Sequence, residues 1–430
     1  MKNLISVSRR YVLTAAASIL VGAGSLSAAQ AQSTDFASEQ ANQFGGSRWV
    51  ATWSAPPMAH GSAFGGSRSF ENQTVRQIVY ISAGGSRVRV KLSNEYGEGP
   101  LIVGSAHAAV QSTGASIVPG SDRTLTFRGR LSVVIPQGAV SLSDPIDLNV
   151  ASNTSLAISL YVPQNTGFAT YHENGNQTAY ISSPGDFSAA VDLPVQDTSL
   201  SRYWLTFVEV LPRRAIDALA IIGDSISEGA TTTPDANRRM SDVLSRKFNS
   251  PVGPARLAVL NQATGCGRLL FDFCGPSGIS RFERDVLNAT GITQVLLELG
   301  YVDIIYPTAF GVPAELVSAD QIIAGIRQLV RRARVRGLKV YVATLLPNGS
   351  TPFANVYTPE NEAKRQAVNR WIRTSREFDA VVDYDLALRD PSEPTQLLPA
   401  YDSSDGIHPN DAGHAALARA TARAIDLSPH

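Results

Sequence analysis

The sequence predicts an α/β domain with a five-stranded parallel sheet, preceded by an antiparallel β-sandwich domain. Two hydrophobic periods support this division. Before residue 212, apolar and polar residues alternate along short runs, as in RVRVKLSN at residues 87–94, and a period of two is typical of half-buried strands. After Pro212, near-continuous apolar runs alternate with amphipathic helical stretches, which indicates parallel strands with helices on both faces.

The first domain is expected at residues 48–212. The turn signal Ala83-Gly84-Gly85 separates two alternating runs, so residues 74–94 are predicted to form a hairpin. Further strands are predicted at residues 101–110, 131–136, 156–162 and 203–210. Gly, Pro, Asn and Ser separate these runs and no helical stretch lies between them, which favours an antiparallel sandwich.

The second domain is expected at residues 213–430. Its strands are predicted at residues 218–222, 256–260, 294–299, 339–345 and 380–383. In the best-marked helix, Ser318 and Gln321 form a capping box at the start and Gly337 marks the end. In folds of this kind, ligands bind beyond the carboxyl ends of the strands, and the first strand ends at Gly223-Asp224-Ser225.

The first 31 residues resemble an export signal. Paired arginines at Arg9-Arg10 precede an apolar stretch that ends at Leu26, and Ala29-Gln30-Ala31 is a small-residue cleavage site. The arginine pair is typical of twin-arginine signals in bacteria. A membrane anchor is the alternative, but Ser, Thr and Gly interrupt the run, which is short for a span. We therefore expect a periplasmic or secreted protein without a membrane segment, with a flexible segment at residues 32–47.

The charge balance gives no support for nucleic-acid or lipid binding. The 430-residue chain has 37 basic and 37 acidic residues, so no net field attracts a polyanion or an anionic membrane. No histidine pair four residues apart with a carboxylate indicates a metal site, and no glycine-rich loop has the setting of a phosphate site. The sequence therefore predicts no metal and no cofactor, and it favours a small neutral ligand or a polymer surface.

The only two cysteines are Cys266 and Cys274, eight positions apart. Two cysteines cannot complete a structural zinc site. In an oxidising compartment we expect a local disulfide between them, which stabilises a fold by about 2 to 3 kcal/mol in the loop-entropy model. Two free buried thiols are the alternative.

Two roles are open for Ser225. It caps the helix that follows the first strand, or it acts as a nucleophile beside a base that a third group orients. Among the six histidines, His408 is the best candidate base, because Asp405 precedes it by three residues and can bind one ring nitrogen while the other faces Ser225. An ordinary polar turn, with Asn410 capping the last helix, is the alternative for Asp405 and His408. His414 is expected to be a packed or surface residue of that helix.

The sequence blocks around these residues resemble a known family. Gly223-Asp224-Ser225 matches the nucleophile block of the GDSL, or SGNH, family of serine esterases and acylhydrolases, and residues 405–409 match its final D-x-x-H-P block. The resemblance covers about residues 215–428. It implies a flavodoxin-like three-layer α/β/α fold, with Ser225 as nucleophile, His408 as general base and then acid, and Asp405 as the orienting carboxylate. The whole chain is similar to a two-domain bacterial branch often associated with plant-polysaccharide breakdown.

The chain departs from the family pattern at the oxyanion hole, which in the family has three donors. The first is the N–H of the serine, here Ser225. The second is a glycine N–H, and the resemblance places Cys266 at that position, where a backbone donor survives the exchange. The third is an asparagine side chain in a G-x-N-D block. Gly300 and Asp303 match that block, but Val302 replaces the asparagine and has no donor.

Three explanations of Val302 are open: a slower enzyme on activated esters, a replacement donor, or a domain used only for binding. Retention of Ser225, Asp405 and His408 favours the first two. The leading expectation is an exported hydrolase of carboxylic esters that acts on a small acyl ester or an acylated carbohydrate through an acyl-enzyme on Ser225. An acyltransferase with the same triad is one alternative.

A catalytically weakened carbohydrate-binding protein is the other alternative. Trp49, Trp53 and Trp204 are its candidate sugar platform. Isolated tryptophans at strand spacing, however, are usually core residues, because the large apolar ring is so often buried.

Overall fold

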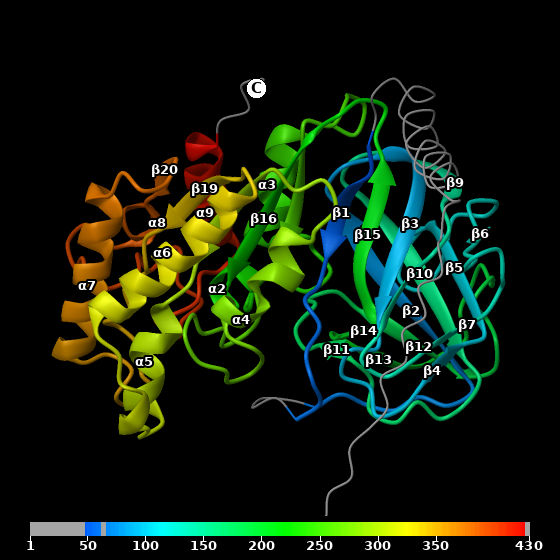
Figure 1. The fold of residues 1–430 in the computed structure, drawn as a ribbon, viewed down its shortest axis with the longest axis horizontal. Coiled ribbons are helices and arrows are strands. Elements are labelled where there is room, and N and C mark those ends of the chain that lie inside the picture. The colour runs from blue at the N-terminus through cyan, green and yellow to red at the C-terminus, as the bar shows by residue number, and fades with distance from the viewer. Residues whose placement is uncertain (1–47, 62–65, 426–430) are drawn as a thin grey trace, which may run out of the picture. The chain divides into compact units, whose positions relative to one another are not determined.

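The computed structural model describes residues 48–61 and 66–425 of the chain. The predicted export signal at residues 1–31, the predicted flexible segment at residues 32–47 and His430 lie outside the described residues. The described residues form one compact unit, within which a β-rich half precedes an α/β half (Figure 1). The division into two domains between residues 212 and 213 stays a prediction. None of the helices in the described part of the chain has the length and hydrophobicity needed to span a membrane.

The β-rich half contains two large antiparallel sheets and two small ones of two strands each. One large sheet has the strand order β1-β15-β3-β8, with β9 also paired to β3, and the other has the order β13-β12-β2-β10-β5-β6. The first sheet consists of β1 (Val50–Ser54), β3 (Gly85–Ser93), β8 (Val140–Leu142), β9 (Ile146–Val150) and β15 (Leu205–Leu211). The second consists of β2 (Gln73–Ile81), β5 (Ser105–Val110), β6 (Arg123–Thr124), β10 (Thr154–Val162), β12 (Ala179–Pro184) and β13 (Val195–Ser199). Both sheets contribute to one hydrophobic core, as expected for a sandwich.

The predicted hairpin at residues 74–94 is wrong. β2 pairs with β10 and β12, whereas β3 pairs with β15, β8 and β9, so the two runs belong to different sheets. The turn between them passes close to other backbone, because a Cβ atom on Gly84 would lie 2.3 Å from the carbonyl oxygen of Val150. Alternation shows that a strand has one buried face, but it does not identify the strand that pairs with it.

Two other predicted strands are divided in the structure. The run at 101–110 forms β4 (Leu101–Val103) and β5, and the run at 203–210 is split between β14 (Arg202–Tyr203) and β15 at Trp204, which has a φ of +57°. The remaining short strands are β7 (Val133–Ile135), which pairs with β4, and β11 (Tyr171–His172), which pairs with β14. Trp53 and Trp204 are buried in the sandwich core, so they do not form an exposed sugar platform.

The α/β half contains a parallel sheet with the strand order β17-β16-β18-β19-β20. Its strands are β16 (Asp217–Gly223), β17 (Leu257–Asn261), β18 (Gln294–Glu298), β19 (Lys339–Ala343) and β20 (Ala380–Val382), close to the predicted ranges. Counted along the chain, the order is second, first, third, fourth, fifth, which is the flavodoxin-like order with a switch point beside the first strand. The fold predicted for this half is therefore confirmed.

Helices cover both faces of this sheet. On one face α3 (Met240–Phe248) packs against α9 (Asp411–Ala424), and on the other α6 (Ala319–Val335) packs against α4 (Gly278–Phe282) and α7 (Pro359–Thr374). Shorter elements are α2 (Ser225–Glu228), α5 (Tyr301–Ala309), α8 (Tyr384–Leu388), the π-helix η1 (Glu283–Leu287) and the 3-10 helix η2 (Pro313–Glu315). The capping box of Ser318 and Gln321 is present at the start of α6, and Asn410 caps α9.

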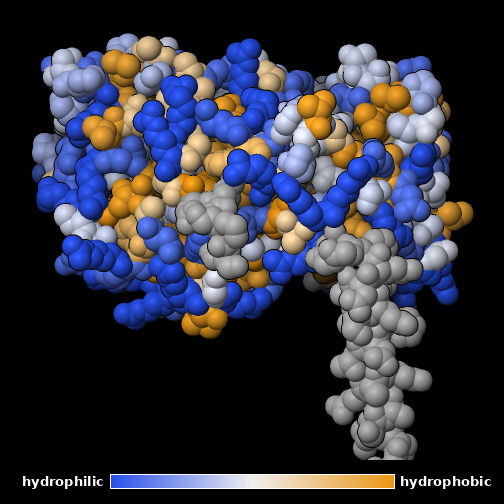
Figure 2. Space-filling model, turned by 90° about the horizontal axis from the view of Figure 1, so that it is seen from above, coloured by the Kyte–Doolittle hydropathy of each residue, from blue (hydrophilic) through white to orange (hydrophobic). Residues whose placement is uncertain are grey.

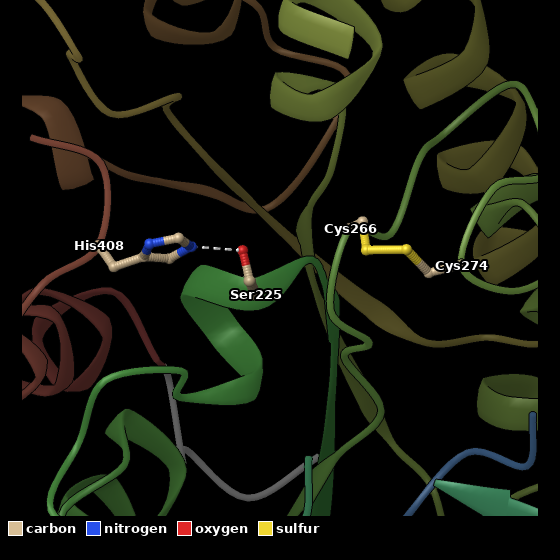
Figure 3. Close-up of a disulfide and its surroundings, with 4 residues drawn as sticks. All are labelled: Ser225, Cys266, Cys274 and His408. Atoms are coloured by element: carbon tan, nitrogen blue, oxygen red, sulfur yellow. Dashed lines mark hydrogen bonds between the residues drawn. A yellow bond between two sulfur atoms is a disulfide. The ribbon is translucent and has the colours of Figure 1, made fainter. Parts of the chain in front are cut away.

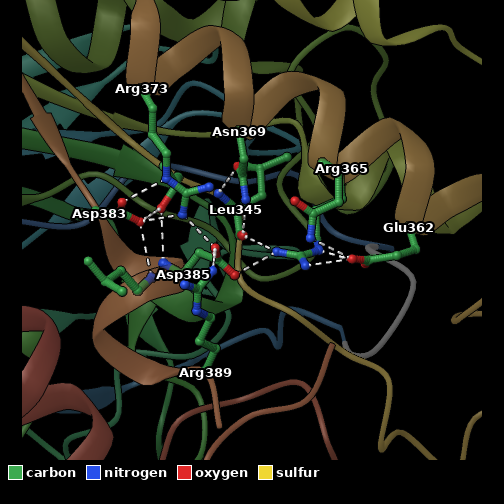
Figure 4. Close-up of polar contacts among 11 residues, drawn as sticks. Leu345, Glu362, Arg365, Asn369, Arg373, Asp383, Asp385 and Arg389 are labelled. Atoms are coloured by element: carbon green, nitrogen blue, oxygen red, sulfur yellow. Dashed lines mark hydrogen bonds and ion pairs between the residues drawn. The ribbon is translucent and has the colours of Figure 1, made fainter. Parts of the chain in front are cut away.

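A network of charged side chains joins α7 to the last strand and to α8 (Figure 4). The buried carboxylate of Asp385 accepts hydrogen bonds from Arg365 and Arg373 at 2.8 and 2.5 Å, and Arg373 also binds Asp383 at the end of β20. Arg365 and Asn369 of α7 each donate to the carbonyl oxygen of Leu345. Because each buried charge has a partner, the network fixes α8, and α8 in turn packs against α9.

Buried hydrogen bonds join the β-rich half to the α/β half at the end of β2. The carbonyl oxygen of Ser82 accepts from Asn249 Nδ2 at 2.9 Å and from Ser245 Oγ at 3.1 Å, and the Ser82 hydroxyl accepts from the Val259 N–H at 2.9 Å. The side-chain oxygen of Asn249 accepts from two further backbone N–H groups, those of Arg256 and Leu257. Asn249 therefore satisfies backbone groups in both halves.

We predict that Asn249→Ala lowers the free energy of unfolding by about 3 kcal/mol, because it leaves several buried backbone groups without partners. Urea titration followed by tryptophan fluorescence and circular dichroism should show one transition moved to lower urea. Asn149→Ala is the control, since Asn149 is exposed, and its effect should stay within about 0.5 kcal/mol. Two separate transitions, of which only one moves, would contradict this role of Asn249.

Candidate active site

Three residues from distant parts of the chain meet at the carboxyl edge of the parallel sheet. Ser225 directly follows Asp224 at the end of β16 and begins α2, and the Asp224 side chain caps that helix by accepting from the Ile226 N–H at 2.9 Å. The Ser225 hydroxyl lies 2.8 Å from His408 Nε2 (Figure 3). His408 Nδ1 lies 2.6 Å from Asp405 Oδ2. The three predicted side chains thus form one continuous chain of hydrogen bonds.

The loop from Asp405 to His408 fixes the imidazole. Asp405 Oδ1 accepts from the backbone N–H groups of Ile407 and His408, each at 2.8 Å. Burial acts to raise the pKa of Asp405, but the hydrogen bonds from the His408 side chain and from these N–H groups outweigh it and hold that pKa well below its ordinary value. An ionised Asp405 keeps the proton on Nδ1, which leaves the lone pair of Nε2 facing Ser225.

The loop also requires a glycine. Gly406 has a φ of +70°, and a Cβ atom there would lie 2.4 Å from the backbone nitrogen of Thr351. Its N–H donates to Asp402 Oδ1 at 3.0 Å. Asn410 then caps α9 by accepting from the Ala412 and Gly413 N–H groups, so the tight turn at 405–408 is held at both ends.

The other described histidines do not face Ser225. His414 is buried in α9, where its Nδ1 accepts from the Met240 N–H at 3.2 Å, which confirms the expectation of a packed residue. His107 lies 2.8 Å from Asp122, and His60 stacks on Phe168. His172 lies 3.1 Å from the carbonyl oxygen of Pro56 through Nδ1 and 3.3 Å from Glu228 through Nε2. Among the described residues, His408 is therefore the histidine that can accept a proton from Ser225.

Buried carboxyl groups lie behind the serine. Burial raises the pKa of Asp224 to about 7 and raises the pKa of Glu298, at the end of β18, well above its ordinary value. Ser227 Oγ donates to Glu298 Oε2 at 2.8 Å. Asp303 joins two neighbouring loops, because its carboxylate accepts from the Leu269 and Leu270 N–H groups at 2.6 and 2.9 Å. This contact ties the start of α5 to the segment that follows Cys266.

Cys266 occupies a backbone conformation that favours glycine. The Gly267 N–H donates to the Thr264 carbonyl oxygen at 2.9 Å, which closes a four-residue turn whose third residue, Cys266, has a φ of +50°. Type II turns require a positive φ at this position and therefore favour glycine there. The turn is held against β16, because the Thr264 N–H donates to the Gly223 carbonyl oxygen at 3.2 Å. The turn therefore keeps its place beside Ser225, although Cys266 stands at a position that favours glycine.

The predicted disulfide is present. Cys266 and Cys274 are bonded through their sulfur atoms, with their Cα atoms 5.8 Å apart (Figure 3). The bond closes the loop that runs from the turn at Cys266 to Cys274. It therefore restrains Cys266, whose backbone is in the left-handed region.

Val302 lies in the first turn of α5. Its side chain is 7 % exposed and lines the cavity that also contains Ser225 and Cys266. Because valine has no polar hydrogen, this position supplies no donor.

A cavity of about 740 Å³ lies beside Ser225 and His408. The β-rich half reaches it through Glu173 and Asn174, which follow β11. Glu228, at the end of α2, also lines it, and its Oε1 lies 3.3 Å from His172 Nε2. Burial raises the pKa of Glu228 to about 8 and lowers that of His172 to about 3, so at neutral pH this is a contact between neutral groups.

Sequence reasoning missed Glu173, Asn174 and Glu228, because no motif marks them. Their place at the cavity depends on how the loop after β11 meets α2. The nearest sequence signal is a cluster of polar residues, Glu173-Asn174-Gly175-Asn176, which by itself indicates only a turn.

Comparisons with known proteins agree with the site blocks. Residues 221–416 match the model of the GDSL-like lipase/acylhydrolase family. The search of curated proteins gave no match. Similar solved structures include a GDSL-like lipase from Bacteroides thetaiotaomicron (16 % identity, TM-score 0.37, covering 48 % of this chain and 87 % of the other). An aryl esterase from M. smegmatis is 17 % identical, with a TM-score of 0.38 and coverages of 48 % and 97 %.

A variant of an acetyl-xylooligosaccharide esterase from Geobacillus stearmophilus is also similar. It is 19 % identical, with a TM-score of 0.38, and the match covers 50 % of this chain and 97 % of the other.

We predict that Cys266→Gly has a free energy of unfolding about 1 kcal/mol higher than that of Cys266→Ala. The reason is that the left-handed backbone conformation is unfavourable for a residue with a Cβ atom but not for glycine. Both variants lose the disulfide and leave Cys274 free, so they differ only in one methyl group. Urea unfolding under reducing conditions measures the difference. In an ordinary backbone conformation, alanine would be as stable as glycine or more so. If Cys266→Ala proves at least as stable as Cys266→Gly, the turn does not have the described geometry in solution.

Proposed function

We propose that this chain, a carboxylic ester hydrolase of the GDSL-like lipase/acylhydrolase family over residues 221–416, is an exported enzyme that uses Ser225 as its nucleophile. The proposed substrates are acetyl or other acyl esters, those of carbohydrates included, and the reaction passes through an acyl-enzyme. The observation that carries the proposal is the hydrogen-bonded chain from the Ser225 hydroxyl through His408 to Asp405, with distances of 2.8 and 2.6 Å.

In the proposed first step, Ser225 Oγ attacks the ester carbonyl carbon while its proton passes to His408 Nε2. Asp405 stabilises the resulting imidazolium through Nδ1. When the tetrahedral intermediate collapses, His408 returns the proton to the leaving alcohol and the acyl group stays on Ser225. A water molecule then attacks the acyl-enzyme with the same help from His408, which releases the acid and restores the serine.

The negative charge of the intermediate needs donors beside Ser225. We assign this role to the backbone N–H groups of Ser225 and Cys266. The turn at Cys266 supports the assignment, since it is held against the end of β16 next to Ser225. Val302 removes the third donor of the family pattern. Loss of one oxyanion donor in other serine hydrolases lowers the rate by about 10² to 10³, so the proposed enzyme is slow on simple esters rather than inactive.

The proposal includes export through the twin-arginine signal at residues 1–31, with a periplasmic or secreted mature enzyme. The disulfide supports this location, because structural disulfides persist mainly in oxidising compartments.

We expect the wild-type enzyme to hydrolyse p-nitrophenyl acetate and Ser225→Ala to lose at least about 10³-fold in kcat. A serine-directed phosphonate should label the wild type and not this variant. Ser250→Ala, at an exposed serine, is the control and should keep both properties. Equal inactivity of wild type and Ser225→Ala, without labelling, would end the proposal. Ester products formed from an added alcohol would identify an acyltransferase with the same nucleophile.

We expect Val302→Asn to raise kcat for p-nitrophenyl acetate about 10-fold or more, because it adds a side-chain donor where the family has one. Val302→Leu is the matched control, since leucine has the same branched arrangement of side-chain heavy atoms as asparagine but no polar hydrogen, and it should give no gain. Steady-state kinetics of both variants measure the difference. An unchanged or lower kcat in Val302→Asn would indicate that another group already supplies the third donor.

A further inference from the structure

The cavity beside Ser225 suits an apolar group. We propose that it binds a bulky apolar part of the ester, so that the enzyme prefers esters of an alkyl or aromatic acid or alcohol to acetylated sugars. This inference rests on the proposed function and names its substrate class. The cavity volume of about 740 Å³ lies within the range of sites that enclose ligands of drug size.

Apolar side chains form most of the cavity wall. They come from the disulfide loop, from α5 and the residue after it, and from the loops at 353–356 and 407–408. The main ones are Phe273, Ile305, Tyr306, Phe310, Phe353 and Ile407. Besides the proposed catalytic residues, the charged or amide side chains in the wall are Glu173, Asn174 and Glu228, and burial keeps Glu228 neutral at pH 7.

The aromatic side of the cavity is built before a ligand arrives. The ring centroids of Phe273 and Tyr306 are 4.2 Å apart, and those of Tyr306 and Phe310 are 5.0 Å apart. Tyr306 thus contacts both phenylalanines. The buried guanidinium of Arg268 lies 4.5 Å from the centre of the Tyr306 ring. Cys274 holds Phe273 through the disulfide. A preformed wall lowers the entropy that is lost when an apolar ligand binds.

The apolar surface continues out of the cavity. Phe310 is 58 % exposed and Phe353 is 55 % exposed, although both line the cavity. On the face shown in Figure 2, hydrophobic residues are mostly scattered among hydrophilic ones, as is normal for a protein surface. Two large exposed rings at one cavity indicate a binding site more strongly than scattered apolar residues do, because clustered exposed apolar side chains mark ligand grooves.

A sugar fits this wall less well than an alkyl or aromatic group. Each sugar hydroxyl that enters the cavity loses hydrogen bonds to water, and the apolar wall gives none in return. An apolar group instead gains from each methylene that it buries. Burial of one methylene favours binding about four-fold, so the cavity discriminates between acyl or alcohol groups by their apolar size.

The test compares kcat/KM along two series. The first varies the acyl group in p-nitrophenyl acetate, butyrate and octanoate, and the second varies the alcohol in benzyl acetate and glucose pentaacetate, where the benzyl ester has no advantage as a leaving group. If the cavity holds the acyl group, the butyrate should exceed the acetate about 15-fold. If it holds the alcohol, the acyl series is flat and the benzyl ester is favoured over the sugar ester. Preference for the sugar ester, or a flat response in both series, would overturn the inference.

Phe310→Ser supplies the structural link. It should reduce the preference for the larger apolar group by several-fold, whichever series shows it, because one ring of the wall is removed. Leu131→Ser removes an apolar side chain of similar exposure, 64 %, in the β-rich half, and should leave the preference unchanged. An equal effect of the two variants would contradict the inference. If the wild type hydrolyses none of these esters and no phosphonate labels it, the proposed function itself fails. If the enzyme is labelled and active but shows no preference for the larger apolar group, only the present inference is overturned.

Discussion

The carboxyl edge of the parallel sheet is the constraint on which the site depends. Parallel strands all end at the same edge, so β16 brings Ser225 there and β18 brings Gly300 and Val302. The strand order places β17 and β18 on either side of β16, and the loop after β17 therefore brings Cys266 beside the serine. His408 reaches the same edge from a loop near the end of the chain, 183 positions from Ser225.

Buried polar contacts convert this arrangement into a defined geometry. Asp405 receives three hydrogen bonds from residues 407 and 408, so the imidazole has one orientation. Asp303 holds the segment after Cys266 through two backbone N–H groups. Groups that lose water on burial must find partners in the protein; Asp405 finds them within its own loop and Asp303 on a neighbouring segment of the site. The same bonds that satisfy burial therefore position the reacting groups.

Much of the candidate site could be predicted from short sequence blocks. The α/β pattern predicts the edge at which Ser225 lies, and the tight spacing of Asp405 and His408 predicts their pairing, because a three-residue separation leaves little freedom. The contribution of the β-rich half could not be predicted. Glu173 and Asn174 reach the cavity because the loop after β11 meets the end of α2, where His172 approaches Glu228, and no periodic pattern encodes a contact between separate halves.

Sequence alone determined the parallel sheet, its capped helices and the chemical identities of Ser225, His408, Asp405, Cys266 and Val302, because hydrophobic period, caps and residue type are local properties. Tertiary structure alone decided that β2 and β3 join different sheets and that Cys266 takes a left-handed backbone in a turn beside the serine. It also decided that aromatic rings from α5 and from two loops line one apolar cavity. Strand partners, backbone dihedrals and cavity walls depend on contacts between residues far apart along the chain, and no local pattern specifies those contacts.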